Sequence, residues 1–277
     1  MSEQSEQGGV LVDVSHVTLR FGGVTSLEDV SLQQRRGEIL SVIGPNGAGK
    51  TSLFNCLTGV YVPQEGSITF TAPDGGTHSL VGGKPHTITQ MGVARTFQNI
   101  RLFNALTAFE NVKIGVEAHQ TTGPVGAMLR LPHTRKEEKY GDARTFELLD
   151  FVGLRQRANE LSSSLPYGAQ RRLEIARALG TQPQLLLLDE PAAGTNPAEK
   201  RDLEQLIRRI NSEMGVTVLL IEHDMRLVMS VTDRVVVLNF GRVIAEGVPA
   251  DVQRNPAVVE AYLGAPAEGG DGDAAAG

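Results

Sequence analysis

One glycine-rich segment constrains this chain more than any other. It reads Gly44-Pro45-Asn46-Gly47-Ala48-Gly49-Lys50-Thr51 and satisfies the pattern G-x-x-x-x-G-K-[ST]. The short apolar run Glu38–Ile43 before it predicts a buried strand, and Thr51–Leu57 after it predicts a helix. Glycines allow backbone N–H groups to face a phosphate, and the start of a helix adds a partial positive charge. The segment therefore predicts a phosphate-binding loop between a strand and a helix.

Two side chains of this loop are expected to bind a magnesium nucleotide directly. Lys50 is expected to reach the β- and γ-phosphates, and Thr51 to hold Mg²⁺ through its hydroxyl. The predicted nucleotide-binding residues of this segment are Gly44, Pro45, Asn46, Gly47, Ala48, Gly49, Lys50, Thr51 and Ser52. Taken alone, the loop fits a kinase or a GTPase equally well. A plain glycine-rich turn with an exposed lysine is the alternative without function.

A second segment ends an apolar run in two carboxylates. Leu185–Leu188 is too apolar for a half-exposed strand, so we place it in the centre of a sheet. Asp189 at the strand end suits Mg²⁺ coordination, either directly or through water. Glu190 is expected to point to the opposite side and to polarise an attacking water. Two solvated residues opening a loop are the alternative, which the phosphate-binding loop makes less favoured.

The composition limits which partners the protein is expected to bind and in which cellular compartment it is expected to lie. The formal net charge is -6, with acidic and basic residues mixed, which argues against a nucleic-acid partner. Cys56 is the single cysteine and is expected to be a small buried hydrophobe. The six histidines show no metal-ligand spacing. Met1–Gly9 is polar and no apolar run could span a bilayer, so we expect a cytoplasmic protein that reaches a membrane only through a partner.

Alternation and turn residues predict the remaining strands. They are expected at Val10–Phe21, Gly66–Phe70, His78–Val81, Val216–Glu222 and Arg234–Leu238, the last turning back into Arg242–Glu246. Thr107 and Glu110 form a capping box that starts a helix, and Asn196-Pro197 starts another.

Helical patterns cover Thr134–Val152 and Leu165–Leu179, and Val116–Arg135 is interpreted as an insertion. The simplest interpretation of Arg171, Arg172 and Arg177 is a solvated side of the second of these helices. Residues 1–9 are expected to be flexible. The Ala/Gly/Asp-rich tail 265–277 is expected to be disordered, because it has nothing to bury.

A third segment, Leu165-Pro166-Tyr167-Gly168-Ala169-Gln170, lies between these features and Asp189. With it the chain resembles the nucleotide-binding subunits of ATP-binding cassette (ABC) transporters, in which a Leu-Ser-Gly-Gly-Gln signature opens a helix and touches the γ-phosphate held by the facing subunit. The resemblance covers Val10 to Gly264, with the motifs in the family's order. It implies an α/β fold: a P-loop ABC ATPase domain over residues 10–264, with a mixed central sheet, an antiparallel β subdomain and a helical signature subdomain at about residues 100–178.

The resemblance gives roles to residues that carry none alone. Phe21 matches the aromatic residue that stacks on adenine, and Gln98 matches the glutamine of the Q-loop. His223 matches the switch histidine that contacts the γ-phosphate, so Glu190 and His223 are the expected catalytic residues. Outside the phosphate-binding loop, the expected ATP-binding residues are Phe21, Gln98, Tyr167, Gly168 and Asp189. The expected Mg²⁺ ligands are Thr51, Gln98 and Asp189.

The signature departs from the family's pattern. Pro166 stands where Ser is usual, Tyr167 replaces the first Gly, Ala169 occupies the Gln position, and Gly168 remains. Pro166 has neither a hydroxyl nor an N–H, so it can donate nothing to a phosphate. We hypothesise that this signature serves a weaker ATP site, or that Tyr167 and backbone N–H groups compensate. Ala192–Asn196 matches the D-loop without such a departure.

Several segments carry a narrower resemblance. They are residues 94–103, the insertion 116–135, and residues 165–178, 188–197, 246–252 and 255–264. They are similar to the longer of the two ATPase subunits of branched-chain (hydrophobic) amino-acid uptake transporters. This implies a second, different ATPase subunit, two membrane permeases and indirectly an extracytoplasmic binding protein as partners, no nucleic acid, and a peripheral position on the inner face of the plasma membrane. Importers of urea, amides or aromatic acids, and a soluble ABC ATPase without transport, remain the alternatives.

Overall fold

The computed structural model describes residues 9–72, 75–118 and 132–263. The strands are β1 (Val10–Phe21), β2 (Val24–Arg35), β3 (Ile39–Ile43), β4 (Glu65–Thr71), β5 (Thr77–Ser79), β6 (Val93–Arg95), β7 (Leu185–Asp189), β8 (Thr217–Ile221), β9 (Arg234–Asn239) and β10 (Arg242–Gly247). The helices are α1 (Lys50–Leu57), α2 (Pro85–Gln90), α3 (Ala108–Glu117), α5 (Pro132–Phe151), α6 (Tyr167–Gly180), α7 (Pro197–Met214), α8 (Met225–Val231), α9 (Pro249–Val252) and α10 (Pro256–Leu263). Two 3₁₀ turns, η1 (Arg155–Arg157) and η2 (Ser162–Ser164), precede α6.

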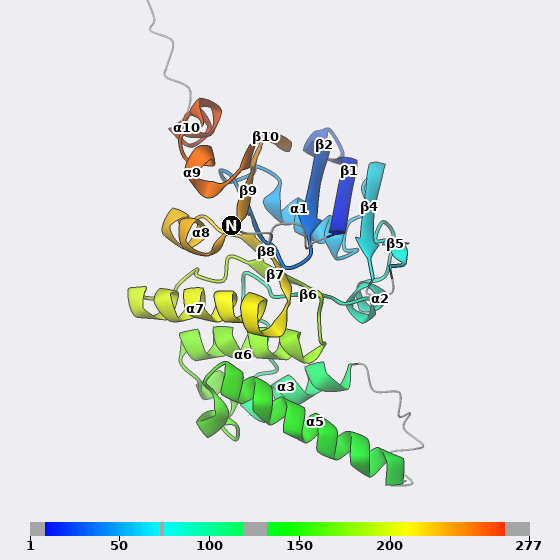
Figure 1. The fold of residues 1–277 in the computed structure, drawn as a ribbon, viewed down its shortest axis with the longest axis vertical. Coiled ribbons are helices and arrows are strands. Elements are labelled where there is room, and N and C mark those ends of the chain that lie inside the picture. Colours follow the sequence, from blue (N-terminus) through cyan, green and yellow to red (C-terminus); the bar gives the residue numbers. More distant parts are fainter. Residues whose placement is uncertain (1–8, 73–74, 119–131, 264–277) are drawn as a thin grey trace, which may run out of the picture.

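A six-stranded sheet in the order β10-β9-β3-β8-β7-β6 forms the centre of the molecule (Figure 1). All neighbouring strands are parallel except β9 and β10, which form the predicted hairpin. Every residue of β3, β7 and β8 is buried, because helices or a second sheet cover both faces of a parallel sheet. The predicted mixed central sheet is confirmed.

A second, antiparallel sheet in the order β2-β1-β4-β5 lies beside the first. It confirms the predicted antiparallel subdomain, but β2 was not predicted. Its sequence contains Glu, Asp and Gln, which are weak strand formers. Val30 and Leu32 nevertheless alternate with exposed residues, and Leu27 is buried on the other side of an irregularity at Asp29. Strand β2 pairs with β1 along nearly its whole length.

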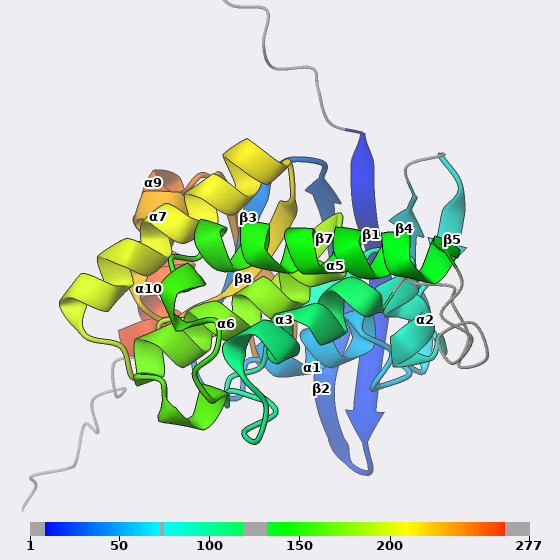
Figure 2. The same ribbon diagram turned by 90° about the horizontal axis from the view of Figure 1, so that it is seen from below.

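Helices α3, α5 and α6 pack against one another at the end of the molecule away from the antiparallel sheet (Figures 1 and 2). The predicted capping box of α3 is present, since Thr107 Oγ1 accepts from the Glu110 N–H and the Glu110 carboxylate accepts from the Thr107 N–H. Helix α7 likewise starts with a capping box at Asn196. Both starts agree with the sequence.

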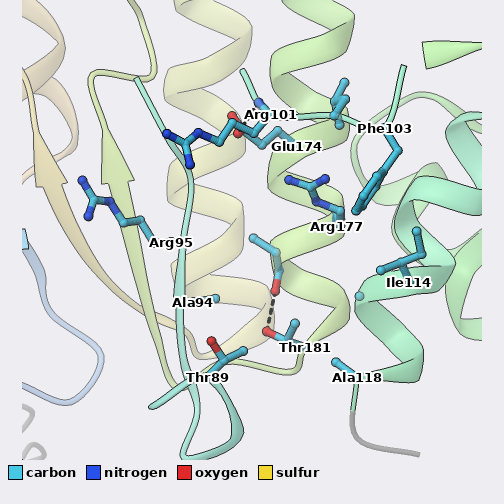
Figure 3. Close-up of a pocket in the computed structure, with 13 residues that line it drawn as sticks. Thr89, Ala94, Arg95, Arg101, Phe103, Ile114, Ala118, Glu174, Arg177 and Thr181 are labelled. Atoms are coloured by element: carbon cyan, nitrogen blue, oxygen red, sulfur yellow. Dashed lines mark hydrogen bonds between the residues drawn. The ribbon is translucent and has the colours of Figure 1, made fainter. Parts of the chain in front are cut away.

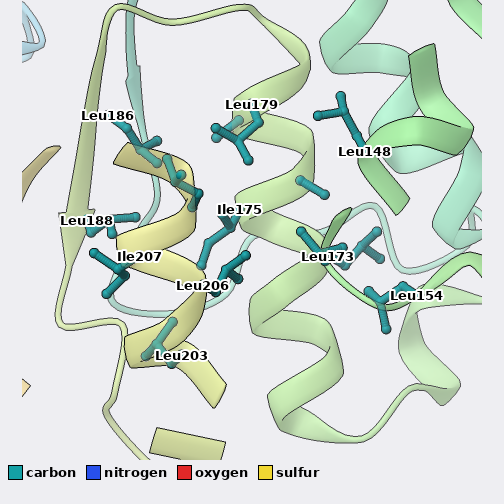
Figure 4. Packing of buried hydrophobic residues seen from close by; sticks show 14 of the residues in the cluster. Leu148, Leu154, Leu173, Ile175, Leu179, Leu186, Leu188, Leu203, Leu206 and Ile207 are labelled. Carbon is teal, nitrogen blue, oxygen red and sulfur yellow. The ribbon is translucent and has the colours of Figure 1, made fainter. Parts of the chain in front are cut away.

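Two large clusters of apolar side chains fill the space on either side of the central sheet. In one, leucines of β7 pack against α6 and α7, as shown for Leu186, Ile175 and Ile207 in Figure 4. In the other, α1 packs between the central and antiparallel sheets and contributes Phe54 and Cys56. Cys56 is fully buried, as predicted, and burial raises the pKa of its thiol to about 11.

One sequence interpretation was wrong, two short elements were not predicted, and three predicted segments lie wholly or mostly outside the described residues. The short elements α2 and β6 were not predicted. Arg171 is buried, and Arg172 and Arg177 are half-buried, so their interpretation as a solvated helix side was wrong. The predicted flexible start (residues 1–8), most of the predicted insertion (residues 119–131) and the tail 265–277 fall outside the described residues.

Candidate nucleotide-binding and catalytic site

Four segments with predicted site residues leave the same edge of the central sheet. Strand β3 runs into Gly44, β6 precedes Gln98, β7 ends at Asp189, and β8 precedes His223. These strands are parallel neighbours in the order β3-β8-β7-β6. Their carboxyl ends therefore meet, and ligands of open α/β sheets bind outside such ends.

The phosphate-binding loop turns on glycines and leads into an uncapped helix. Gly44, Gly47 and Gly49 have φ angles of 150°, 80° and 104°. A Cβ on Gly44 would overlap the Leu238 carbonyl oxygen, and a Cβ on Gly49 would lie 2.6 Å from the Ser26 carbonyl oxygen. Among the described residues no side chain caps α1. Its first N–H groups remain available to an anion.

Lys50 follows the phosphate-binding loop in the sequence, and its side chain folds back onto that loop. Its Nζ donates to the carbonyl oxygens of Gly44, at 2.7 Å, and Pro45, at 2.9 Å. The residue is 8 % exposed. Burial lowers the pKa of Lys50, and the charges of Glu190 and Asp189 act in the opposite direction. The ammonium group is thus desolvated and within electrostatic reach of both carboxylates.

Gln98, Glu190 and His223 come together although they are far apart in the sequence. Gln98 Nε2 donates to Glu190 Oε2 at 2.9 Å, and His223 Nδ1 lies 3.8 Å from the same oxygen. Glu190 has a φ of 45° while its N–H donates to the Ile221 carbonyl oxygen. A non-glycine residue in this conformation costs about 1–3 kcal/mol and persists only where its surroundings fix it. The fold therefore holds this carboxylate in one position.

Asp189 has a partner that the sequence did not predict. The residue is 3 % exposed, and its Oδ2 accepts a hydrogen bond from Arg95 Nη2 at 2.7 Å. Thr51, at the start of α1, is exposed and carries a hydroxyl, whereas the adjacent Ser52 hydroxyl bonds to that of Ser26 at 2.7 Å.

Magnesium fits the donors that these residues offer. The Thr51 hydroxyl, the Asp189 carboxylate and the Gln98 amide oxygen are hard oxygen ligands, which Mg²⁺ prefers. Three such ligands leave room for waters and phosphate oxygens, as is usual for this ion. The described part of the chain contains no group of three or more His, Cys, Asp or Glu residues that could form a separate metal site.

Phe21 lies at the end of β1, on the antiparallel sheet. Its ring is 45 % exposed and contacts the Tyr61 ring edge to face, with 5.0 Å between the centroids. Tyr61 therefore fixes one side of the ring, and the exposed part is accessible to a flat base.

The signature segment presents little of its polar surface. Pro166 is the residue before α6, and no side-chain cap is present there. Gly168 and Ala169 are buried, and a Cβ on Gly168 would overlap the Glu199 carboxylate. Tyr167 is 43 % exposed. It is the one large side chain exposed among these four residues.

Glu222 is a buried side chain beside the site, and it was not predicted as a site residue. It is 0 % exposed, and its Oε1 accepts from the Ala192 N–H at 2.8 Å. Its Oε2 accepts from the N–H groups of His223, at 3.0 Å, and Asp224, at 3.1 Å. One carboxylate thus ties the segment after Glu190 to the segment of His223. The sequence signal that could have identified Glu222 is a charged residue directly after the apolar run of β8.

Arg171 was also missed. Its Nη1 donates to the Phe97 carbonyl oxygen at 2.6 Å, and its Nη2 to the Gln98 carbonyl oxygen at 2.8 Å. Nη2 also donates to the Tyr167 hydroxyl at 3.1 Å. The start of α6 is thereby joined to the Gln98 segment. No sequence signal could reveal this, because the acceptors are backbone atoms more than 70 residues away.

A groove of about 500 Å³ lies beside the Gln98 segment (Figure 3). Phe103 and Ile114 are 50 % and 40 % exposed and form its apolar side. Arg101 and Arg177 add positive charge, and the Arg177 guanidinium lies 5.5 Å from the centroid of the Phe103 ring. The groove therefore combines apolar and cationic surface.

Two family models match the chain. Residues 27–193 match the model described as "ABC transporter", and residues 242–268 match the model described as "Branched-chain amino acid ATP-binding cassette transporter". Within the described part of the chain, no helix is both apolar and long enough to cross a membrane.

Curated relatives cover almost the whole chain. The high-affinity branched-chain amino acid transport ATP-binding protein LivG of Salmonella typhimurium is 45% identical over 254 residues, which are 92% of this chain and 98% of that protein. The corresponding protein BraF of Pseudomonas aeruginosa is 46% identical over the same shares. A protein of the same kind from Archaeoglobus fulgidus is 34% identical over 92% of this chain and 96% of its own length.

Solved structures share the fold. A nucleotide-free ATP-binding cassette from an ABC transporter superposes with a TM-score of 0.78 at 29% identity, covering 92% of this chain and all of that chain. The ADP conformation of a cassette from an ABC transporter gives the same TM-score at 30% identity, covering 92% of this chain and 99% of that chain.

Proposed function

The chain belongs to the ATP-binding subunits of ABC transporters for branched-chain amino acids, and on this premise we propose how its residues power transport. Glu190 activates the water that hydrolyses ATP, and partner permeases use the resulting motion to take up leucine, isoleucine and valine. The observation that carries this proposal is the cluster of Gln98, Glu190 and His223 within 4 Å of one carboxylate oxygen.

The loop and Lys50 bind the phosphates in this proposal. The uncapped start of α1 offers N–H groups and a partial positive charge to the nucleotide. Lys50 has three N–H donors and uses two of them on the Gly44 and Pro45 carbonyl oxygens. The ammonium is therefore already positioned over the loop. Thr51, Gln98 and Asp189 would hold Mg²⁺, which would supply positive charge beside the phosphates.

Glu190 takes up the proton of the attacking water, and Gln98 positions its carboxylate. The Gln98 amide holds Oε2 of Glu190, so Oε1 is the oxygen that takes the proton of the attacking water. A positioned general base contributes about 10²–10⁴-fold to a rate. The His223 side chain is 62% exposed, and it faces the site from the end of β8, where it can contact the terminal phosphate.

The other subunits meet this chain at two further places. A second ATPase subunit, which we take to be a different one, contributes its phosphate loop opposite Tyr167 and Gly168 at the start of α6. A cytoplasmic permease loop docks in the groove, with apolar side chains on Phe103 and Ile114 and acidic ones toward Arg101. We place the ATPase domain at residues 10–264, its helical subdomain at about 100–178, and the assembly on the inner face of the plasma membrane.

Uptake by whole cells tests the proposal. In a strain lacking this gene, we expect the wild-type chain to restore uptake of labelled leucine, isoleucine and valine. The Glu190→Gln variant should not restore it, whereas Glu213→Gln, at an exposed carboxylate on α7, should. Unlabelled urea, an amide or an aromatic acid should fail to compete. Restored uptake of one of these compounds in labelled form, with no restored leucine uptake, would replace the proposed substrate.

A further inference from the structure

Arg95 ends β6 and lies between two parts of the proposed ATPase site. Strand β6 pairs in parallel with β7, so that Arg95 is opposite Leu187, near Asp189. At the edge of the groove its side chain extends away from Phe103 and Ile114 (Figure 3). The side chain is only 8% exposed. Its charge is therefore buried at the end of the central sheet.

The two guanidinium nitrogens of Arg95 hold different elements. Nη2 donates to Asp189 Oδ2 at 2.7 Å, and the Asp189 side chain is 4% exposed. Nη1 donates to Asn55 Oδ1 at 2.7 Å and to Thr58 Oγ1 at 3.4 Å. Asn55 belongs to α1, and Thr58 directly follows it. One planar side chain thus connects the helix of the phosphate loop to the carboxylate at the end of β7.

Two aromatic rings flank the guanidinium. Its central carbon lies 5.5 Å from the centroid of the Phe54 ring and 5.4 Å from that of Phe97. Such cation–π contacts stabilise a desolvated guanidinium. The rings limit where Arg95 can move, so Asp189 Oδ2 is fixed in turn.

Stability alone does not explain this arrangement. Arg95 Nε is buried without a hydrogen-bond partner among the described residues. A buried ion pair that is incompletely hydrogen-bonded is often no more stable than apolar residues of the same volume. Among the described residues no hydrogen bond engages the other carboxylate oxygen of Asp189, Oδ1. The geometry leaves that oxygen to a ligand.

We propose that Arg95 is a positioning residue that fixes Asp189 Oδ2 against α1 and so presents Oδ1 to Mg²⁺. The inference rests on the proposed function, because it takes Asp189 as a Mg²⁺ ligand. A lysine cannot replace Arg95 in this role, since one ammonium cannot reproduce the planar fork that bridges Asn55 and Asp189. Arg95→Lys keeps the charge and removes the bridge.

The test compares binding of a fluorescent ATP analogue with Mg²⁺ and with EDTA, on the full-length chain. The ratio of the two affinities measures the contribution of Mg²⁺. In Arg95→Lys we expect this ratio to fall about tenfold, as for a lost hydrogen bond to a charged group. The affinity in EDTA should stay within about twofold of wild type by the same argument, because the loop and Lys50 are intact.

Arg36→Lys is the matched control. Arg36 also bridges separate elements, by donating to Gln184 Oε1 and to the carbonyl oxygens of Thr71 and Ala72. It has no bond to Asp189. A purely structural effect lowers the midpoint of thermal unfolding in both variants and leaves the Mg²⁺ ratio unchanged, and that result would overturn the inference.

Asn55→Ala provides a second variant should Arg95→Lys fold poorly. It removes only the anchor of Arg95 on α1, so the Mg²⁺ ratio should fall less than in Arg95→Lys. A ratio within twofold of wild type in both variants would contradict the role of Arg95. If Mg²⁺ does not raise the affinity of the wild-type chain for the nucleotide, the assignment of Asp189 as a Mg²⁺ ligand in the proposed function is wrong. That outcome is distinct from failure of the role of Arg95.

Discussion

The edge of the central sheet and the start of α6 carry the two halves of the proposed ATP chemistry, and they are built differently. At the edge, side chains with defined partners converge: Lys50 on its loop, Gln98 on Glu190, and Arg95 on Asp189. At the start of α6, Pro166 donates nothing, and Gly168 is buried beneath Glu199. In the proposed function, the residues for this chain's own nucleotide have defined partners, whereas the start of α6 offers few side-chain donors to the nucleotide of the partner subunit.

This difference indicates an unequal pair of sites. The site completed by this chain's signature has lost the serine hydroxyl of the usual family pattern. Tyr167 adds a phenol, but its hydroxyl already accepts a hydrogen bond from Arg171. Because Arg171 also holds the Gln98 backbone, the two halves are connected within one chain. Because the two sites are unequal, we expect variants at the sheet edge to change ATP binding and turnover more than variants at the start of α6.

The largest effect is expected for Lys50→Met. Loss of the buried ammonium removes its charged hydrogen bond to phosphate and its two bonds to the loop carbonyl oxygens, and a hydrogen bond to a charged group is worth about 1.5–3 kcal/mol. The affinity for ATP should fall about 100-fold or more on the same basis. Titration of a fluorescent nucleotide measures it, with Lys139→Met at an exposed position of α5 as the control. A loss below tenfold would show that the loop binds without Lys50.

Glu222→Gln should lower turnover while leaving the KM for ATP near its wild-type value. The amide offers an N–H₂ group to the backbone N–H of Ala192 or to those of His223 and Asp224, so in either orientation the tie between these two segments is broken. Removing a buried partner costs about 1–3 kcal/mol, and we expect His223 to lose its position and turnover to fall about tenfold. Equal changes in turnover and KM, or none, would remove Glu222 from this role.

Pro166→Ser probes the sparsely equipped half. A serine before α6 can cap the helix, which is worth about 0.5–1 kcal/mol, and it restores the hydroxyl of the family's signature. ATP turnover of the complex with its partner ATPase should rise several-fold. An unchanged rate would contradict the unequal pair. Glutamine at position 169 is not part of this test, because Ala169 is buried and a longer side chain would overpack the core.

The smallest effect is expected for Gly168→Ala. The added Cβ would displace the end of the flexible Glu199 side chain, which also accepts from the Asn196 N–H in the capping box of α7. Losing that contact should cost about 0.5–1 kcal/mol, visible as a lower midpoint of thermal unfolding. Gly23→Ala, where a Cβ meets nothing within 4 Å, is the control. Destabilisation of several kcal/mol would mean that the added Cβ meets atoms less able to move than the end of the Glu199 side chain.

The features that could be predicted from the sequence are those with a signal in neighbouring residues. The strands β1 and β3, the loop before α1, and the capping boxes at Thr107 and Asn196 all have signals within a few residues, and the structure contains them. The family motifs then identified the segments that meet at the sheet edge. Their roles in catalysis and metal binding remain predictions.

Partners that are distant in the chain could not be predicted. Arg95 and Asp189 are 94 residues apart, and Arg171 bonds to carbonyl oxygens that any sequence would supply. Strand β2 was missed for a related reason, since its polar residues disfavour a strand until pairing with β1 supplies the hydrogen bonds. Tertiary contacts, rather than local propensity, determine these features.

The turnover of Glu190→Gln tests the central claim most directly. Bound nucleotide and released phosphate are measured together in the purified chain and in its complex with the partner subunits. The variant should bind ATP with wild-type affinity and hydrolyse it at least about 100-fold more slowly, as expected when a general base is lost. Turnover within about twofold of wild type is a much smaller loss than that expected for a general base. It would contradict the assignment of Glu190 and of the cluster around it.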